Sequence, residues 1–85
     1  MHVELKRSNS KKTLKVEVSS WEVASIAVQT FIQDHDLGAG CSDGAPAFTG
    51  GKVFEGSKQI GRISYNGRCW NMDDKLINVL SGEVL

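Results

Sequence analysis

The side chains of this chain that could carry out catalysis are few, and they lie near one another only in sequence. His35 precedes a glycine-rich stretch that contains Cys41 and Asp43. That order could supply a base, a thiol nucleophile and a carboxylate that orients the base. A structural role explains His35 as fully, because it falls in the last turn of a predicted helix, where the helix dipole stabilises positive charge. We favour the structural role and expect that the protein is not an enzyme.

A metal site would have to be assembled from His2, His35, Cys41 and Cys69, which are the two histidines and two cysteines of the chain. None of them forms a closely spaced pair of the C-x2-C or H-x3-H kind that structural metal sites use. We therefore expect neither a metal nor another cofactor. Cys69 is expected to face outward on a strand, and Cys41 is expected to be a loop thiol.

Length and composition favour a small soluble domain of balanced charge. The 85 residues are expected to form one domain, residues 1–85, with ten lysines and arginines and ten acidic residues giving a net charge of zero. This balance removes the general attraction to phosphates and disfavours nucleic acid as a partner, whereas it leaves a homodimer open. The first residues lack an apolar signal segment, and no run approaches the roughly 20 apolar residues of a membrane span. We expect a cytoplasmic protein with no membrane contact.

The pair Asn-Gly at positions 66–67 stands between two alternating runs and predicts a β-hairpin with a two-residue type I′ turn. In this register Ile63 lies opposite Trp70, and Arg62 lies opposite Asn71. Alternation then predicts that Trp70 faces the core. The outward face of the hairpin is predicted to carry Ser64, Cys69, Arg62 and Asn71.

A helix of about four turns is predicted to begin after Ser19 and to end before Gly38. Ser19 and Glu22 have the spacing of a capping box, in which each side chain bonds the backbone N–H of the other residue. Side chains at helical spacing form one stripe that is expected to pack on a sheet: Trp21, Ala24, Ala27, Val28, Phe31, Ile32 and His35. Residues 38–51 follow without either period and contain five of the nine glycines, which predicts a long loop.

Strands are predicted on both sides of the helix. Residues 3–6 and 13–18 precede it, and residues 52–55 follow it and turn at Gly56-Ser57 into the hairpin. A two-residue turn would place Phe54 in the core, and a three-residue turn would place Val53 there, so both registers stay open. Residues 73–80 fit either a short helix or a final strand. The predicted fold is α+β, an antiparallel sheet of roughly four to five strands in the order ββαβββ with one long helix on one face.

Two further patterns concern nucleic acid. Basic residues with Tyr65 and Trp70 between them could form a strip of the kind found on nucleic-acid-binding sheets, but the predicted register places Trp70 and Arg62 on opposite faces. The basic residues are Lys52, Lys58, Arg62 and Arg68. The order of the elements also resembles double-stranded RNA-binding domains. This chain has Asp73-Asp74-Lys75 where that family has a lysine cluster, so RNA binding is disfavoured.

Residues 15–71 resemble a broader group of proteins in their layout. The segments that carry the resemblance are Ser-Trp-Glu at the helix entry, Phe-Thr-Gly-Gly-Lys-Val-Phe before the hairpin, and Gly-Arg-Ile-Ser-Tyr-Asn-Gly-Arg-Cys-Trp within it. The group consists of small proteins carried on bacterial phages, plasmids and integron cassettes, some of which inhibit host defence systems such as CRISPR effectors. The resemblance transfers no functional residue and implies a protein that acts by binding another protein.

We therefore expect a non-enzymatic protein-binding module, in its most specific form an inhibitor of a bacterial defence complex encoded by a mobile element. Its partner-binding residues are predicted to be Asp43 and Phe48 in the loop, with Arg62, Arg68 and Asn71 on the hairpin. Arg68 is expected at the rim, because the predicted register places it on the face opposite Arg62. Phe48 could instead fold back onto the core.

The alternative function is a small-molecule-binding or catalytic domain. Its pocket would lie under residues 38–51, where Cys41, Asp43, Phe48 and His35 could converge.

Overall fold

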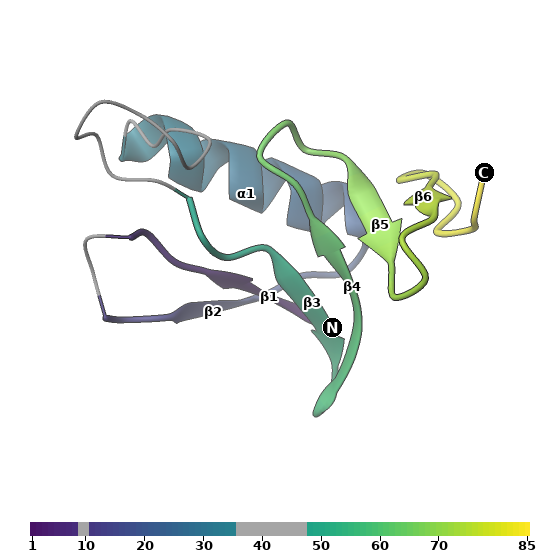
Figure 1. Ribbon diagram of the computed structural model, residues 1–85, viewed down its shortest axis with the longest axis horizontal. Coiled ribbons are helices and arrows are strands. Elements are labelled where there is room, and N and C mark those ends of the chain that lie inside the picture. Colours follow the sequence, from purple (N-terminus) through teal and green to yellow (C-terminus); the bar gives the residue numbers. More distant parts are fainter. Residues whose placement is uncertain (9–10, 36–47) are drawn as a thin grey trace.

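The computed structural model describes residues 1–8, 11–35 and 48–85, which form one helix and one antiparallel sheet (Figure 1). The helix α1 spans Trp21–Asp34. The strands are β1 His2–Leu5, β2 Leu14–Glu17, β3 Lys52–Glu55, β4 Lys58–Ile63, β5 Cys69–Asn71 and β6 Leu76–Ile77. Their order in the six-stranded sheet is β2-β1-β3-β4-β5-β6. The N-terminal strand β1 therefore lies inside the sheet, between β2 and β3.

This architecture confirms the predicted α+β class, with one helix on one face of an antiparallel sheet. Its six strands exceed the predicted number, and the added strand is β6, which forms where a terminal helix was the other expectation. The side-chain oxygen of Asn71 accepts hydrogen bonds from the backbone N–H groups of Asp73 and Lys75, both at 2.9 Å. Asp74 has a left-handed φ of 57°. These contacts make a tight turn rather than a helical start, and β6 then pairs with β5.

The start of α1 differs from the prediction by one residue. Ser20 is the N-cap, because its hydroxyl accepts a hydrogen bond from the N–H of Val23 at 3.2 Å. The predicted capping box of Ser19 and Glu22 is therefore wrong, whereas the length of 14 residues matches the predicted four turns. The helical stripe is confirmed, with Ala24, Val28 and Ile32 buried and Trp21, Ala27 and Phe31 partly buried. α1 is the one helix among the described residues, and it is not long and apolar enough to cross a membrane.

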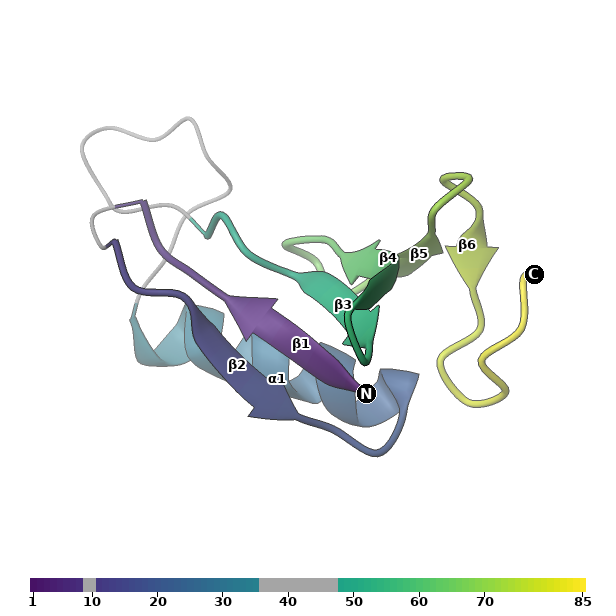
Figure 2. The same cartoon turned by 90° about the horizontal axis from the view of Figure 1, so that it is seen from below.

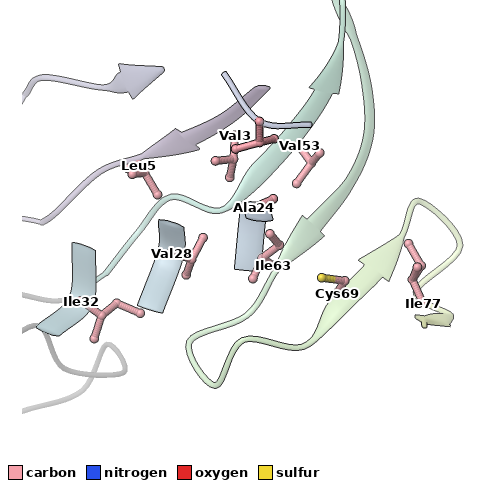
Figure 3. Close-up of a cluster of buried hydrophobic side chains, with 10 residues drawn as sticks. Val3, Leu5, Ala24, Val28, Ile32, Val53, Ile63, Cys69 and Ile77 are labelled. Carbon is pink, nitrogen blue, oxygen red and sulfur yellow. The ribbon is translucent and has the colours of Figure 1, made fainter. Parts of the chain in front are cut away.

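The core lies between α1 and the sheet face that α1 covers. Its buried strand residues are Val3, Leu5, Val53, Ile63, Cys69 and Ile77. Figure 3 shows these side chains with those of Ala24, Val28 and Ile32, and Ile77 lies at the end of the cluster beyond β5. Burial of each larger aliphatic side chain stabilises the fold by about 1.5 to 3 kcal/mol. This interior holds the helix and the β4–β5 hairpin in a fixed relation.

The β4–β5 hairpin is paired one residue away from the predicted register. Ile63 lies opposite Cys69, and Arg62 lies opposite Trp70. The connecting loop has three residues, 65–67, because the N–H of Ser64 donates to the carbonyl of the residue at position 68 at 2.9 Å. The last loop residue is a glycine with φ of 85°. A type I turn followed by a left-handed residue is the common form of such a loop.

A shift of one residue exchanges the two faces of a strand. Cys69 is completely buried, which corrects the prediction that it faces outward. Trp70 lies outward beside Arg62, which corrects its placement in the core. The predicted separation of Trp70 from Arg62 is therefore wrong.

The β3–β4 pairing combines features of both registers that the sequence left open. Phe54 lies opposite Gln59, so the turn at positions 56–57 has two residues. The next pair is Val53 with Gly61, which leaves one extra residue on β4 as a bulge. Because of this bulge Val53 is fully buried, whereas Phe54 is only partly buried.

The second face of the sheet is covered by no described element. Figure 2 shows β1 and β2 in front of α1, with β2 at the border of the sheet. The side chains that alternate with the core residues point to this open face. On this face the strands can present side chains to a partner.

Candidate interaction surface

The outward side of the β4–β5 hairpin gathers aromatic and basic side chains on the open face of the sheet. Arg62 and Trp70 are opposite each other on β4 and β5. After the buried pair of Ile63 and Cys69, Ser64 and Arg68 form the next outward pair toward the loop. Tyr65 occupies the loop and is 42% exposed. We call these residues, Arg62, Ser64, Tyr65, Arg68 and Trp70, the hairpin face.

Arg62 is held in position by two neighbours. The central carbon of its guanidinium lies 5.4 Å from the centre of the Trp70 ring, a cation–π contact. Its Nη2 lies 3.2 Å from Oδ1 of Asp74 in the β5–β6 turn. Both side chains of this ion pair are substantially exposed, so each contact contributes about 1 kcal/mol or less. Together they orient the guanidinium across the ring without removing it from the surface.

The hairpin loop is anchored from behind by α1. The hydroxyl of Ser25 donates to the carbonyl of Gly67 at 2.7 Å, and the amide of Gln29 donates to the carbonyl of Tyr65 at 2.8 Å. Within the loop, the hydroxyl of Ser64 contacts the side-chain oxygen of Asn66. Hydrogen bonds thus hold two carbonyls of the loop against α1, and a third contact lies within the loop itself. Tyr65 therefore extends from a well-supported backbone.

Two shallow hollows meet on this surface. The first is lined by Arg62, Ser64, Tyr65, Asn66 and Trp70. The second shares the first three of these residues and extends toward Phe48, Lys52 and Gln59. Both are open depressions rather than enclosed cavities, a shape that suits a protruding side chain of a partner better than a buried small molecule.

The aromatic surface continues on neighbouring strands. His2 of β1 and Phe54 of β3 are opposite each other and stack with ring centres 5.1 Å apart and planes 10° apart. Like Trp70 and Arg62, they alternate with core residues and therefore lie on the open face.

Two of the predicted partner-binding residues lie together on the hairpin face. Arg62 and Arg68 were expected on opposite faces, and the observed register corrects this by placing both outward. Arg68 is exposed, and its side chain makes no ion pair with the described residues. These two arginines flank Ser64 on the same surface.

The other predicted residues are placed differently. Asn71 lies opposite Gly61, and its side-chain oxygen is used by the β5–β6 turn. Phe48 is partly buried, packs against the core and meets Phe31 edge-on at 6.2 Å, which matches the fold-back that the sequence offered as an alternative. It also lines the second hollow, and its role in partner binding stays a prediction. Asp43 lies outside the described residues.

Tyr65 and Trp70 are the surface residues that the sequence interpretation missed. The glycine at position 67 was the available signal. After the two-residue loop, the most common hairpin connection is a three-residue loop that ends in a left-handed glycine. That loop would have turned Trp70 outward. It would also have placed Tyr65 at the tip.

The residues considered for catalysis do not form a site in the described part of the chain. Nδ1 of His35 lies 3.0 Å from the carbonyl oxygen of Phe31, and the two rings are in contact at 4.4 Å. Burial raises the pKa of the Cys69 thiol from 9.0 to about 11, so it is protonated at neutral pH. No group of three potential metal ligands occurs among the described residues. Cys41 lies outside them.

No protein-family model, curated protein or solved structure matches this chain in comparisons with known proteins. The resemblance to proteins of bacterial mobile elements therefore stays a prediction.

Proposed function

We propose that the protein acts by binding another protein through the hairpin face. The observation that carries the proposal is the β4–β5 register, which brings Arg62, Arg68 and Trp70 to one outward surface with Tyr65 at its tip. Tryptophan, tyrosine and arginine are the residues most enriched among those that dominate protein–protein binding energy. The anchored loop supports the same function, because a preorganised surface loses less conformational entropy on binding.

The chemistry of the face indicates a partner with carboxylates. Arg62 is already paired with Asp74, whereas Arg68 has no ion pair among the described residues and can accept one from outside. A planar guanidinium binds a carboxylate through two parallel hydrogen bonds. The adjoining hollow, which Tyr65 and Trp70 line, can receive an apolar or aromatic side chain of the same partner.

In its specific form, the proposal is that the partner belongs to a bacterial defence complex such as a CRISPR effector and that binding inhibits it. This step rests on the resemblance of residues 15–71 to small proteins of mobile elements. A small domain whose function is recognition can block a larger assembly by covering one of its surfaces.

The binding proposal is tested with two surface variants and a matched control. Arg68→Glu reverses the unpaired charge, and Tyr65→Ala removes the exposed ring. Lys58→Glu makes the same charge reversal on an exposed residue at the other end of β4. Immobilised wild-type protein and Lys58→Glu should capture the same bacterial protein from lysate. Arg68→Glu and Tyr65→Ala should each weaken binding by at least about 30-fold, the loss that defines a binding hot spot.

Circular dichroism and thermal unfolding establish that all four proteins are folded. Equal capture by all four would refute a role for the hairpin face. The inhibitory form is tested separately in bacteria that carry a CRISPR effector directed against a phage. Expression of the wild-type protein should restore phage growth, and Arg68→Glu should not.

A second candidate, binding of single-stranded nucleic acid, is favoured by one observation. The sequence argument against it included the separation of Trp70 from Arg62, and these side chains are in contact. Aromatic rings beside basic residues on an open sheet can stack with bases and pair with phosphates. The balanced charge of the chain still argues against it. Salt-dependent binding of a fluorescent single-stranded oligonucleotide, lost in Arg68→Glu, would replace the protein-binding proposal.

A further inference from the structure

The two borders of the sheet are formed by its edge strands, β2 and β6, which differ in their pairing. At the β6 border, Ile77 forms a bridge with Val84, so the C-terminal segment continues the pairing. At the other border, β2 pairs with β1 on one side and with no described strand on the other. An unpaired strand border presents backbone N–H and carbonyl groups that can pair with another chain.

The hydrogen bonds of β2 show which of its backbone groups point outward. The N–H of Val18 donates to the carbonyl of Met1 at 2.9 Å, so Val18 is directed toward β1. In an antiparallel strand the N–H and carbonyl of one residue point to the same side, and the side alternates along the chain. Val16 and Leu14 therefore also bond β1, whereas the backbone groups of Lys15 and Glu17 point away from the sheet.

We propose that β2 pairs antiparallel with β2 of a second copy of this chain, with Val16 opposite Val16 at a twofold axis. In this register Lys15 of each copy lies opposite Glu17 of the other, and these are the residues whose backbone groups point outward. Their side chains share the open face, so each pair also brings opposite charges together. The two six-stranded sheets would then form one continuous sheet.

The alternatives to this register are less favourable. A shift by one residue would place an outward-bonding residue opposite an inward-bonding one, which antiparallel pairing does not permit. The two nearest permitted shifts place Lys15 opposite Lys15 or Glu17 opposite Glu17, and like charges directly opposite each other destabilise a sheet. The proposed register is thus selected by both the backbone and the charges of β2.

The neighbouring surface is apolar and suits the same occupant. An open groove between β2 and α1 is lined by Leu5, Leu14, Val16, Ala27 and Phe31 together with more polar residues. Leu14 is 53% exposed. The second copy would bring its own Leu14 and Val16 to this side of the sheet, because they alternate with Lys15 and Glu17. A net charge of zero leaves no general repulsion between two copies.

Each charged residue of β2 also has an intramolecular neighbour of opposite sign. Glu17 lies 3.9 Å from the N-terminal amine of Met1, and Lys15 lies opposite Glu4 on β1. Glu17 remains 82% exposed, so this contact leaves it accessible to the second copy.

The test is an exchange of charges measured by analytical ultracentrifugation over a wide concentration range. Wild-type protein is expected to form a dimer. Lys15→Glu and Glu17→Lys each replace two attractive contacts by two repulsive ones and should weaken dimerisation by about tenfold or more. The double variant Lys15→Glu/Glu17→Lys should restore the wild-type affinity, and an equimolar mixture of the two single variants should form heterodimers.

Thermal unfolding of each variant separates weakened association from a damaged fold. A wild-type protein that stays monomeric, or a dimer whose affinity none of the variants changes, would overturn the proposal. Wild-type protein that is monomeric but binds a β-strand of a different protein at β2 would assign the border to another occupant and would also overturn it. The β2 border is separate from the hairpin face, so Arg68→Glu should leave dimerisation unchanged.

Discussion

Cys69 illustrates how the environment of one side chain decides its chemistry. Cys69 is completely buried, and its sulfur lies 3.9 and 4.0 Å from the carbonyl oxygens of Trp21 and Gly67. Burial disfavours the charged thiolate and raises the pKa to about 11. A thiolate is the reactive form of cysteine, so this residue serves as a small apolar side chain of the core.

We predict that Cys69 is protected from alkylation in the folded protein. In a Cys41→Ser variant Cys69 is the one remaining cysteine. Iodoacetamide near pH 8 should modify it much more slowly than in urea-unfolded protein, because the native thiol is both buried and protonated. The rate is followed by mass spectrometry. Equal rates in folded and unfolded protein would show that the thiol is accessible.

The raised pKa of Cys69 also predicts a loss of stability at alkaline pH. Below about pH 9 the thiol is protonated in both the folded and the unfolded chain, so it adds no pH dependence to the free energy of unfolding. Between pH 9 and 11 the unfolded chain releases this proton and the folded chain retains it, so the free energy of unfolding falls, by at most about 2.7 kcal/mol. The Cys69→Ala chain should lack this contribution. Identical pH dependence in both chains would contradict the assignment.

At the scale of elements, the loop of the β4–β5 hairpin controls which side chains form the hairpin face. Gly67 has φ of 85°, and a Cβ placed on it would lie 3.1 Å from the hydroxyl of Ser25. Gly56 in the β3–β4 turn also has a positive φ, 62°, but a Cβ there would meet nothing within 4 Å. Both positions therefore require a left-handed backbone, but an added side chain would be crowded at position 67 and not at position 56.

We predict that Gly56→Ala lowers the free energy of unfolding by about 1 kcal/mol, the cost of a left-handed conformation. Gly67→Ala should cost about 2 to 3 kcal/mol, because its φ is less favourable and the new methyl group crowds the helix that anchors the loop. Urea unfolding measures both. If the two variants lose the same stability, the contact between the loop and α1 contributes little to the hairpin.

At the scale of the whole molecule, the two ends of the chain have unequal structural importance. β1 lies between two strands and contributes Val3 and Leu5 to the core. The last residues lie at the β6 border, where the N–H of Leu85 donates to the carbonyl of Leu76 at 2.9 Å. Leu85 itself is 73% exposed. Removal of β1 divides the sheet, whereas removal of the C-terminal segment shortens one border.

We predict that deletion of residues 1–5 abolishes folding. Loss of two buried aliphatic residues alone costs about 4 to 10 kcal/mol, comparable with the total stability of a small domain. Deletion of residues 80–85 should leave a folded protein of lower thermal stability. Far-ultraviolet circular dichroism and thermal unfolding distinguish the two outcomes. A folded chain that lacks residues 1–5 would contradict the interior position of β1.

The features that depend on local periodicity could be predicted from the sequence. The helical stripe from Trp21 to His35 and the alternating strands each follow from the spacing of apolar side chains within one segment. The glycine at position 67 likewise located the hairpin. The α+β class follows, because one amphipathic helix and several amphipathic strands can bury their apolar sides only against each other.

The register and the order of the strands depend on contacts between segments far apart in the sequence. Asn66-Gly67 fits a two-residue or a three-residue loop, and the loop that forms is the one whose carbonyls meet Ser25 and Gln29 of α1. That choice buries Cys69 and turns Trp70 outward, so the candidate site could not be assigned from the hairpin alone. The interior position of β1 likewise depends on its pairing with β3 across most of the chain. Such contacts join residues far apart in sequence, so they cannot be predicted from a local sequence pattern.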